Sequence, residues 1–485
     1  MGQRIHSVKF NAVLNMILSS SSMIFPLITI PYASRILQPS GIGAVSFAQS
    51  VASYFSLVAL LGVQMYGVRA CAQVRDDPRE LARVVEELLI ILASSTTIIF
   101  LIYIASVLFI PRLAEDRLLF MVFGLVLWLA SFGAEWFYQA IEQYGYITIR
   151  SIAFKFIGLL LMFFFVHKQS DYVIYGGIVV FTGYGANILN MFRLRTLVTF
   201  RPLKELNIRR HFKPMSSFLI SSISSGMYAQ ADLVILGFLT SNTVVGVYQL
   251  VAKVKSMLCM AINSVVNVML PRLSYYVKKS PDKYYDLLVK NINFVLLLAF
   301  EGIGAASLCA EPIVMLLGGS QYKIVTIPLL CILPALLFAS LNTTLSQYLI
   351  SIGKERKYAL VNFTGLVSAI VYCFICIPLW GASGAAMACS LCEFTALIMR
   401  CWFSKDFLKK IYKSIEVWQS LISAGIAFCL TFGIRCFISF DNPIIEIAWV
   451  GSIYSIFYVL LLFIFCETFV RSFWKIILNK TYGRR

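Results

Sequence analysis

Ionisable side chains inside long apolar runs are the residues of this sequence with the clearest capacity for chemistry. Charge is costly in hydrocarbon, so such residues face a bundle interior or a wet cavity and serve in the movement of ions or substrates. The candidate cations inside the runs are Lys155, Lys253 and Lys255, and the candidate carboxylates are Asp232, Glu301 and Glu393. The cations could bind an anionic substrate, and the carboxylates could carry a coupling ion.

The lysines each have a structural and a functional interpretation. Lys253 and Asp232 fall at similar depths on neighbouring predicted spans, where a salt bridge between them could simply hold the helices together. The alternative places Lys253 on the wall of a lumen, where it meets an anion. Lys155 lies about two turns into its run, close to the limit from which a lysine can snorkel to the interface. Lys155 is therefore the strongest single candidate.

Three arginines near the ends of apolar runs extend the candidate cationic site: Arg35, Arg69 and Arg150. An arginine at the end of a span commonly anchors the helix at the interface or sets its topology. The alternative is that these residues join the lysines in a cationic cavity.

Other kinds of site find little support in the sequence. Two CxxC pairs, at 373/376 and 389/392, lie within apolar runs, where free cysteine behaves as a small hydrophobic residue rather than a zinc ligand. The three histidines are far apart, and neither a GxxxxGK[ST] nor an HExxH motif occurs. We therefore expect no metal, no cofactor and no enzymatic activity.

The elements that must position these residues are transmembrane helices. The 485 residues are 59% apolar and 13% charged, with a mean hydropathy of +0.82, whereas soluble proteins carry about 25% charged residues. Runs of about 20 apolar residues predict an all-α polytopic membrane protein with about 14 transmembrane helices. The predicted spans are 12–33, 43–65, 84–109, 118–138, 147–166, 172–192, 215–238, 244–270, 287–309, 325–350, 358–378, 383–403, 416–438 and 444–466.

The basic residues that give the net charge of +18 are distributed according to the predicted topology. If the N-terminus is cytoplasmic and basic residues at span ends are counted with the adjacent segments, the cytoplasmic segments hold 32 Lys and Arg and the opposite segments hold six, with three more deep inside spans. This alternation is a positive-inside pattern, so we expect both termini in the cytoplasm. It also argues against nucleic acid as a partner, because the basic charge is explained by topology.

The order of spans and charges predicts four parts. Residues 1–195 form an N-terminal six-helix lobe, 196–214 a basic cytoplasmic linker, and 215–403 a C-terminal six-helix lobe. Residues 404–485 add two helices and a basic tail. Lobes of six spans share one orientation, which implies a parallel pseudo-twofold repeat. The sequence evidence for this repeat is the similarity of GAVSFAQSV from Gly43 to GVYQLVAKV from Gly246.

Three stretches carry a resemblance to a known family: PYASRILQPSGIGAVSFAQSVASYF with LGVQMYGVRACAQVRDD, AEWFYQAIEQYGYITIRSI, and ADLVILGFLTSNTVVGVYQLVAKV. They resemble Wzx-type O-antigen flippases, the polysaccharide-exporter branch of the MOP transporter superfamily. Arg35, Arg69, Arg150, Asp232 and Lys253 fall within these stretches. Lys155 and Lys255 lie just beyond two of them, and Glu301 and Glu393 lie outside.

The resemblance implies two six-helix lobes around a cationic central cavity and transport by alternating access. The cargo would be an undecaprenyl-pyrophosphate-linked oligosaccharide, the O-antigen repeat unit, carried from the cytoplasmic to the periplasmic leaflet of the bacterial inner membrane. Membrane lipids and other polysaccharide assembly proteins would be its further partners. The alternatives are a multidrug or metabolite antiporter of the same superfamily, a membrane-embedded O-antigen polymerase, and a structural scaffold. A polymerase should carry a long charged periplasmic loop, which the sequence lacks.

Overall fold

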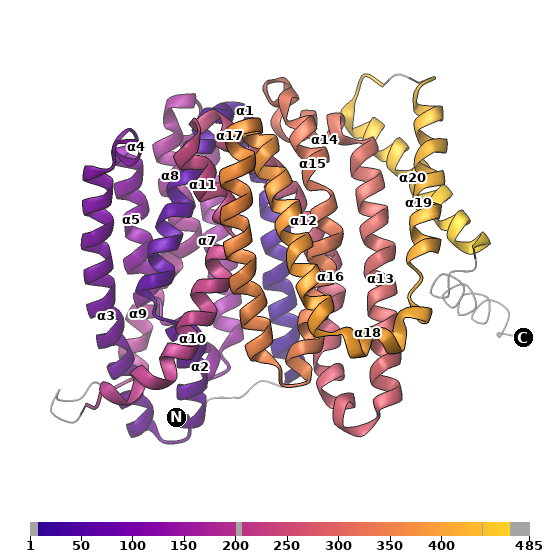
Figure 1. Ribbon diagram of the computed structural model, residues 1–485. Coiled ribbons are helices and arrows are strands. Elements are labelled where there is room, and N and C mark those ends of the chain that lie inside the picture. Colours follow the sequence, from indigo (N-terminus) through magenta and orange to yellow (C-terminus); the bar gives the residue numbers. More distant parts are fainter. Residues whose placement is uncertain (1–7, 200–205, 439, 466–485) are drawn as a thin grey trace, which may run out of the picture. The chain divides into compact units, whose positions relative to one another are not determined.

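The computed structural model describes residues 8–199, 206–438 and 440–465, and these residues form helices joined by short connections (Figure 1). No β-strand occurs in these ranges, so the predicted all-α class is confirmed. The predicted basic C-terminal tail lies at 466–485, outside the described residues.

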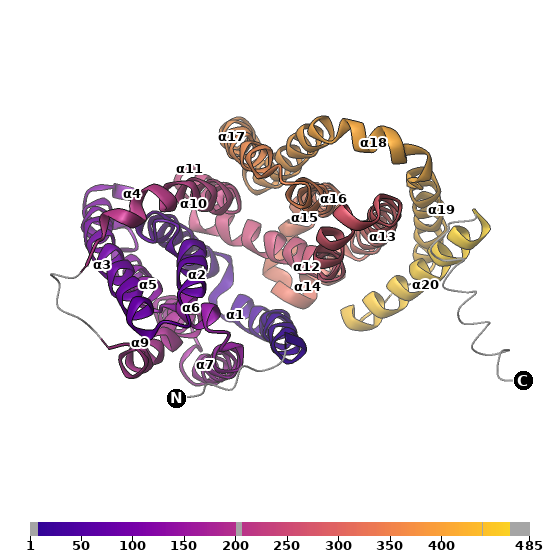
Figure 2. The same cartoon turned by 90° about the horizontal axis from the view of Figure 1, so that it is seen from below.

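The chain divides into two compact units, Met1–Gly246 and Val247–Arg485 (Figures 1 and 2). The first contains α1 (Val8–Ala59), α2 (Val63–Gln73), α3 (Pro78–Phe109), α4 (Pro111–Ala114), α5 (Arg117–Phe132), α6 (Glu135–Ala140), α7 (Tyr144–Phe165), η1 (Gln169–Asp171), α8 (Tyr172–Val180), η2 (Phe181–Gly185), α9 (Ala186–Leu197), α10 (Arg209–Tyr228) and α11 (Ala231–Leu239). The boundary falls early in α12 (Asn242–Lys279). The second contains α13 (Pro281–Leu308), α14 (Ala310–Gly318), η4 (Ser320–Val325), α15 (Thr326–Ile332), α16 (Pro334–Ser351), α17 (Glu355–Phe403), α18 (Lys405–Ile411), η5 (Tyr412–Ser414), α19 (Val417–Arg435) and α20 (Pro443–Ile464).

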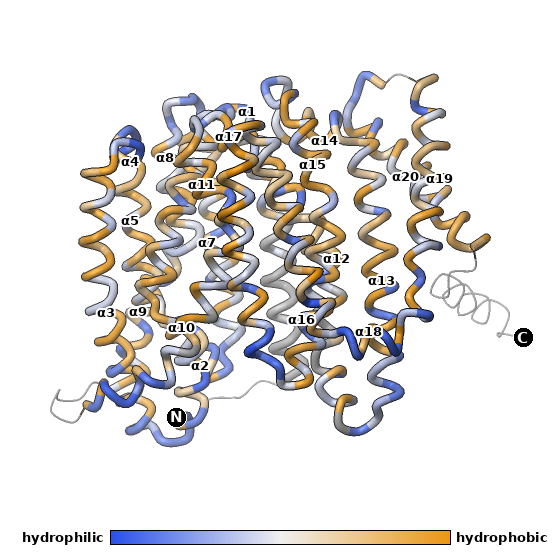
Figure 3. The backbone as a smooth tube through the Cα atoms, in the orientation of Figure 1, coloured by the Kyte–Doolittle hydropathy of each residue, from blue (hydrophilic) through white to orange (hydrophobic). Residues whose placement is uncertain are grey.

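Apolar residues cover the long helices, and hydrophilic residues gather in the connections between them (Figure 3). Among the described residues, ten helices are long and apolar enough to cross a membrane. Two bent pairs raise that number to twelve when each pair is one span: 218–228 with α11, and 320–332 with α16. The second pair bends by 45° where Pro334 begins α16, since proline cannot continue the hydrogen-bond ladder of the preceding helix.

Helix α1 is a hairpin rather than one straight helix. Gln38 has a left-handed φ of 58° and interrupts the helix just before Pro39. Thr29 and Gln49 line the same cavity, although a straight helix would separate residues twenty apart by about 30 Å. The chain therefore reverses direction near Gln38, so the two arms are separate spans, as predicted at 12–33 and 43–65, although the second arm ends at Ala59.

Helix α17 reverses in the same way. Gly381 has φ 53° and ψ −122°, a conformation that favours glycine. The hydroxyls of Tyr372 and Thr395 are 3.0 Å apart across the two arms. When the arms of α1 and of α17 are counted separately, each hairpin adds one span to the twelve, and the described residues accommodate the fourteen spans predicted.

The predicted lobe boundary and the compact units divide the chain at different places. Helices α10 and α11 pack on α1, and α10 also packs on α2, so residues up to Gly246 join the first unit. The assignment of 215–403 to one six-helix lobe stays a prediction, as does the parallel repeat.

The two segments that suggested a repeat meet at their first glycines. A Cβ atom on Gly43 would lie 1.7 Å from the Asn242 carbonyl oxygen and 2.7 Å from the Gly246 nitrogen. A Cβ on Gly246 would lie 1.8 Å from the carbonyl oxygen of Pro39. Only glycine permits this backbone approach, which holds the start of α12 against the turn of α1.

The start of α3 is specified locally. Asp77 is its N-cap, and the Asp77 carboxylate accepts hydrogen bonds from the backbone N–H groups of Arg79 (2.8 Å) and Glu80 (3.3 Å). Pro78 occupies the first helical position, where its missing N–H costs nothing. The first turns of α3 pack with α2 and α6 around a buried apolar cluster that includes Cys71 and Leu88.

Candidate functional site

The first unit contains a cavity of about 270 Å³ with Lys155 on its wall. The cavity lies between the two arms of α1, helix α7, and the run from α8 into η2. Its other polar lining residues are Thr29, Gln49, Tyr175 and Thr182, and the remainder of the wall is apolar or glycine. This volume is near the lower end of the range for small-molecule sites, roughly 300–1,000 Å³.

Backbone irregularities shape the walls of this cavity. The first arm of α1 contains Pro26 and Pro31, and Pro26 lines the cavity. The segment η2 is a π-helical turn, a rare conformation that is frequently found at functional sites. It approaches α7 at Gly158, where a Cβ would lie 2.0 Å from the Thr182 hydroxyl. Glycine at 158 thus lets the π-turn and α7 enclose the cavity.

Lys155 is half-buried, and its ammonium donates a hydrogen bond to the Ser21 hydroxyl, 3.1 Å away on the first arm of α1. Ser21 is itself buried. The structure therefore places the strongest sequence candidate between membrane-spanning helices and beside a cavity.

The three arginine candidates, all in the first unit, lie outside the Lys155 cavity. Arg35, on the first arm of α1, and Arg69, on α2, are exposed, and neither is among the described residues that line the Lys155 cavity. Arg150 is buried, with 6% of its surface exposed. Its guanidinium donates to the Ala186 carbonyl (3.3 Å) and lies 5.7 Å from the centre of the Tyr146 ring.

In the second unit, one cation and one carboxylate candidate gather on a single face of α17. The Lys255 ammonium is 3.1 Å from Cys389 Sγ, and the Glu393 carboxylate accepts a 2.8 Å hydrogen bond from the Asn342 amide. Cys389 and Glu393 are four residues apart on the second arm, so they share a helix face. Lys253, two residues before Lys255 on α12, is exposed.

Asp232 lies in the first turn of α11, just after the bend that separates α11 from α10. A carboxylate is favoured there because unpaired N–H groups and the helix dipole concentrate positive charge at the N-terminus. Asp232 and Lys253 belong to different compact units, so their salt bridge stays a prediction.

Glu301, on α13, accepts a hydrogen bond from the Ser455 hydroxyl of α20. Its second oxygen is buried and has no hydrogen-bond partner among the described residues. Arg435 of α19 adds a second link, because it pairs with Glu446 (2.7 Å) and donates to the Leu308 carbonyl (2.5 Å). Polar contacts thus link α19 and α20 to α13.

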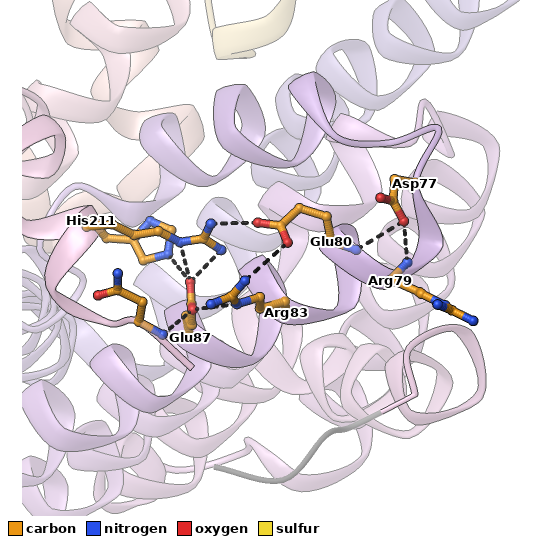
Figure 4. Close-up of polar contacts among 8 residues, drawn as sticks. Asp77, Arg79, Glu80, Arg83, Glu87 and His211 are labelled. Carbon is orange, nitrogen blue, oxygen red and sulfur yellow. Dashed lines mark hydrogen bonds and ion pairs between the residues drawn. The ribbon is translucent and has the colours of Figure 1, made fainter. Parts of the chain in front are cut away.

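Sequence reasoning missed a buried polar cluster around Glu87, near the start of α3 (Figure 4). The Glu87 side chain is fully buried and accepts hydrogen bonds from the Asn207 backbone N–H (2.6 Å), Arg210 Nε (2.7 Å) and His211 Nε2 (2.6 Å). Arg83 Nε lies 3.4 Å away on the same helix. This Glu87 cluster ties α3 to the end of the basic linker and the start of α10. The only sequence signal was a carboxylate at the edge of an apolar run.

The Glu87 cluster determines the state of His211. Burial lowers the pKa of His211 below its ordinary value of 6.5, although the Glu87 carboxylate opposes that shift. A neutral imidazole satisfies both contacts: Nε2–H donates to Glu87, and Nδ1 accepts from the Tyr66 hydroxyl at 2.7 Å. Tyr66, His211 and Glu87 therefore form a chain of hydrogen bonds in which each donor points at the next acceptor.

Comparison with solved structures identifies the fold as that of multi-pass membrane transporters. The lipid II flippase MurJ in an inward closed conformation aligns over 92% of this chain and 99% of its own, with a TM-score of 0.63 and 15% identity. An inward-facing multidrug resistance MATE family transporter of the MOP superfamily aligns over 83% of this chain and 99% of its own, with a TM-score of 0.67 and 13% identity.

Comparison of sequences gives the family. The family of polysaccharide biosynthesis proteins matches residues 8–277, more than half of the chain, and this protein belongs to it. The protein named "Putative O-antigen transporter" from Escherichia coli (strain K12) is 22% identical over 408 residues, which cover 81% of this chain and 96% of that protein. The resemblance to polysaccharide exporters seen in the sequence is confirmed at the level of the family.

Proposed function

We propose that this protein is a flippase for a polyprenyl-pyrophosphate-linked oligosaccharide, the O-antigen repeat unit. It carries this lipid from the cytoplasmic to the periplasmic leaflet of the bacterial inner membrane by alternating access. The observation that carries the proposal is the similarity to the protein named "Putative O-antigen transporter" along 96% of that protein's length, together with the family match. The transporter fold and the cavity beside Lys155, between membrane-spanning helices, support it.

We propose that Lys155 contacts the pyrophosphate of the cargo. A lipid-linked pyrophosphate carries about two negative charges, and its lipid tail remains in the bilayer while only the headgroup needs a polar path. An ammonium on the cavity wall lowers the cost of removing those charges from water. Arg35, Arg69, Arg150, Lys253 and Lys255 stay candidates for further steps along the path.

The driving force has an electrical part in this scheme. An inside-negative potential favours outward movement of each negative charge by about 2.3 kcal/mol per 100 mV. Counter-movement of a proton or sodium ion through Asp232, Glu301 or Glu393 would reset the carrier. Both termini lie in the cytoplasm in this scheme, since 32 Lys and Arg fall on that side against six on the other.

A strain deleted for the gene and complemented with variants tests the function and the role of Lys155. Lipid-linked repeat units should accumulate on the cytoplasmic leaflet of the deletion strain, and the Lys155→Met variant should reproduce the accumulation at normal protein levels. Lys155→Arg should restore part of the export, because it keeps the charge. Lys290→Ala is the matched control, since that lysine is exposed and pairs with Asp286 at the surface.

The two parts of the proposal fail separately. Normal export by Lys155→Met would remove this lysine from the path while leaving the flippase intact. Normal surface polysaccharide in the deletion strain, without accumulated lipid-linked units, would overturn the function itself.

A further inference from the structure

A second cavity lies at the opposite end of the first unit from the Glu87 cluster. Glu87 lies near the start of α3, whereas the cavity is lined by Asp116, which follows the end of that helix. The cavity has a volume of about 340 Å³. Four connections meet in it: the turn of α1 at Ser40, the start of α5 at Asp116, η1 at Gln169, and the start of α12 at Asn242. We call it the loop pocket.

The loop pocket is built on a carboxylate held in a fixed position. Asp116 Oδ1 accepts from the Tyr172 hydroxyl (2.9 Å), and Oδ2 accepts from the Asn242 amide (2.8 Å). Asp116 occupies the N-cap position of α5, but its side chain makes no cap hydrogen bond. The Asp116 carboxylate therefore lies at the pocket and does not cap the first turn of α5.

The Asn242 amide is oriented by a second layer of contacts. Its oxygen accepts from Arg112 at 2.7 Å, which assigns the amide nitrogen to Asp116. Arg112 also donates to the Gly237 and Thr240 carbonyls at the end of α11. The contact of Gly43 with the start of α12 fixes the same residue through the backbone. The pocket wall is therefore pre-organised, which lowers the entropic cost of binding.

The chemistry of the lining selects a neutral polyhydroxylated ligand. Each carboxylate oxygen has a second lone pair and can accept from a ligand hydroxyl. Gln169 donates one amide hydrogen to the Ser40 hydroxyl (2.7 Å), and its amide group can both donate to and accept from a ligand. The Tyr172 ring and the small residues Gly41 and Ala44 add an apolar surface. A negatively charged pyrophosphate would be repelled by Asp116.

We propose that the loop pocket is a sugar subsite that binds one monosaccharide of the oligosaccharide cargo at the periplasmic mouth. The identity of the cargo and the side of the membrane rest on the proposed function. Asp116 accepts hydrogen bonds from sugar hydroxyls, and Gln169 pairs with a further hydroxyl. The pyrophosphate is handled at the lysine cavity, so charge and sugar are recognised at separate sites.

The test uses the full-length protein in nanodiscs and in vesicles. Free glucose, galactose, mannose and N-acetylglucosamine are titrated while saturation-transfer NMR detects binding. At least one sugar should bind to the native protein, and Gln169→Ala should weaken it by up to about tenfold, the loss expected for one hydrogen bond. Asp116→Asn should weaken it further, because it removes the charged acceptor. Gln169 is exposed, so its variant should fold normally.

Glu311→Gln is the control, because it removes the same charge at an exposed position that pairs with Lys323 and does not line the pocket. Three results would overturn the sugar subsite: an equal loss of binding in this control, unchanged binding in both pocket variants, or binding of none of the four sugars. In vesicles, native protein that flips the full lipid-linked unit faster than a unit with a single sugar, with this preference lost in Gln169→Ala, would support it. An absence of flipping of either lipid by native protein would instead refute the proposed function.

Discussion

The replacement of Glu87 by glutamine should destabilise the protein strongly, although the two side chains have nearly the same shape. The carboxylate is fully buried and receives three hydrogen bonds of 2.6–2.7 Å, from Asn207, Arg210 and His211. A glutamine offers only one acceptor oxygen, and its amide nitrogen would face N–H donors. It also leaves the Arg210 guanidinium without its buried counter-charge.

The expected cost follows from the number and kind of lost contacts. Hydrogen bonds to a charged group contribute about 1.5–3 kcal/mol each, and breaking a buried ion pair costs about 3–5 kcal/mol. We expect Glu87→Gln to lower the free energy of unfolding by about 3–4 kcal/mol. Glu80→Gln is the matched control, because Glu80 binds the same Arg210 at 2.6 Å but is about one third exposed. A partly exposed pair contributes less than about 1 kcal/mol.

Cys71 provides a local assay for this loss. Its thiol is buried in the apolar cluster that packs against the start of α3, and burial raises the pKa of Cys71 to about 12, which keeps the thiol unreactive. Labelling with a thiol reagent over a denaturant or temperature series, read at the Cys71 peptide by mass spectrometry, reports opening of this region. If Glu87→Gln and Glu80→Gln shifted the labelling transition equally, the reasoning from burial would be wrong.

Two further perturbations test the pH dependence and the cavity wall. Because burial lowers the pKa of His211, this histidine binds a proton less readily in the folded protein than in the unfolded chain. The contribution of His211 to the free energy of unfolding is therefore present above pH 6.5 and is lost as the pH falls through the pKa of the folded state. Thermal unfolding below pH 6.5 should therefore show a steeper loss of stability in the native protein than in His211→Gln, and parallel pH profiles would contradict it. Gly158→Ala should displace Thr182, cost about 1–3 kcal/mol and slow export of the lipid-linked unit. The double variant Gly158→Ala with Thr182→Ala should regain part of the stability and part of the export rate. If Gly158→Ala alone had no effect on either, the close contact between Gly158 and Thr182 would not be needed to shape the cavity.

The sequence alone determined the class of the protein and its membrane spans. Apolar runs of about 20 residues predict helices that cross a bilayer, because the backbone must satisfy its own hydrogen bonds there. The same local information separated the two arms of α1 and of α17, since the turns carry Pro39 and Gly381. The three quoted stretches were enough to indicate the family, and all three lie within the residues that its model matches.

The tertiary structure decided which polar residues meet. Glu87 and His211 are 124 positions apart, and nothing in the pattern around either one names the other. Lys155 was singled out by its depth in an apolar run, but the cavity beside it depends on a π-turn and a glycine contact from a different helix. Periodicity and hydropathy are properties of neighbours along the chain, whereas a cavity or a buried ion pair exists only where distant helices pack. That physical difference is why the helices could be predicted and the sites had to be seen.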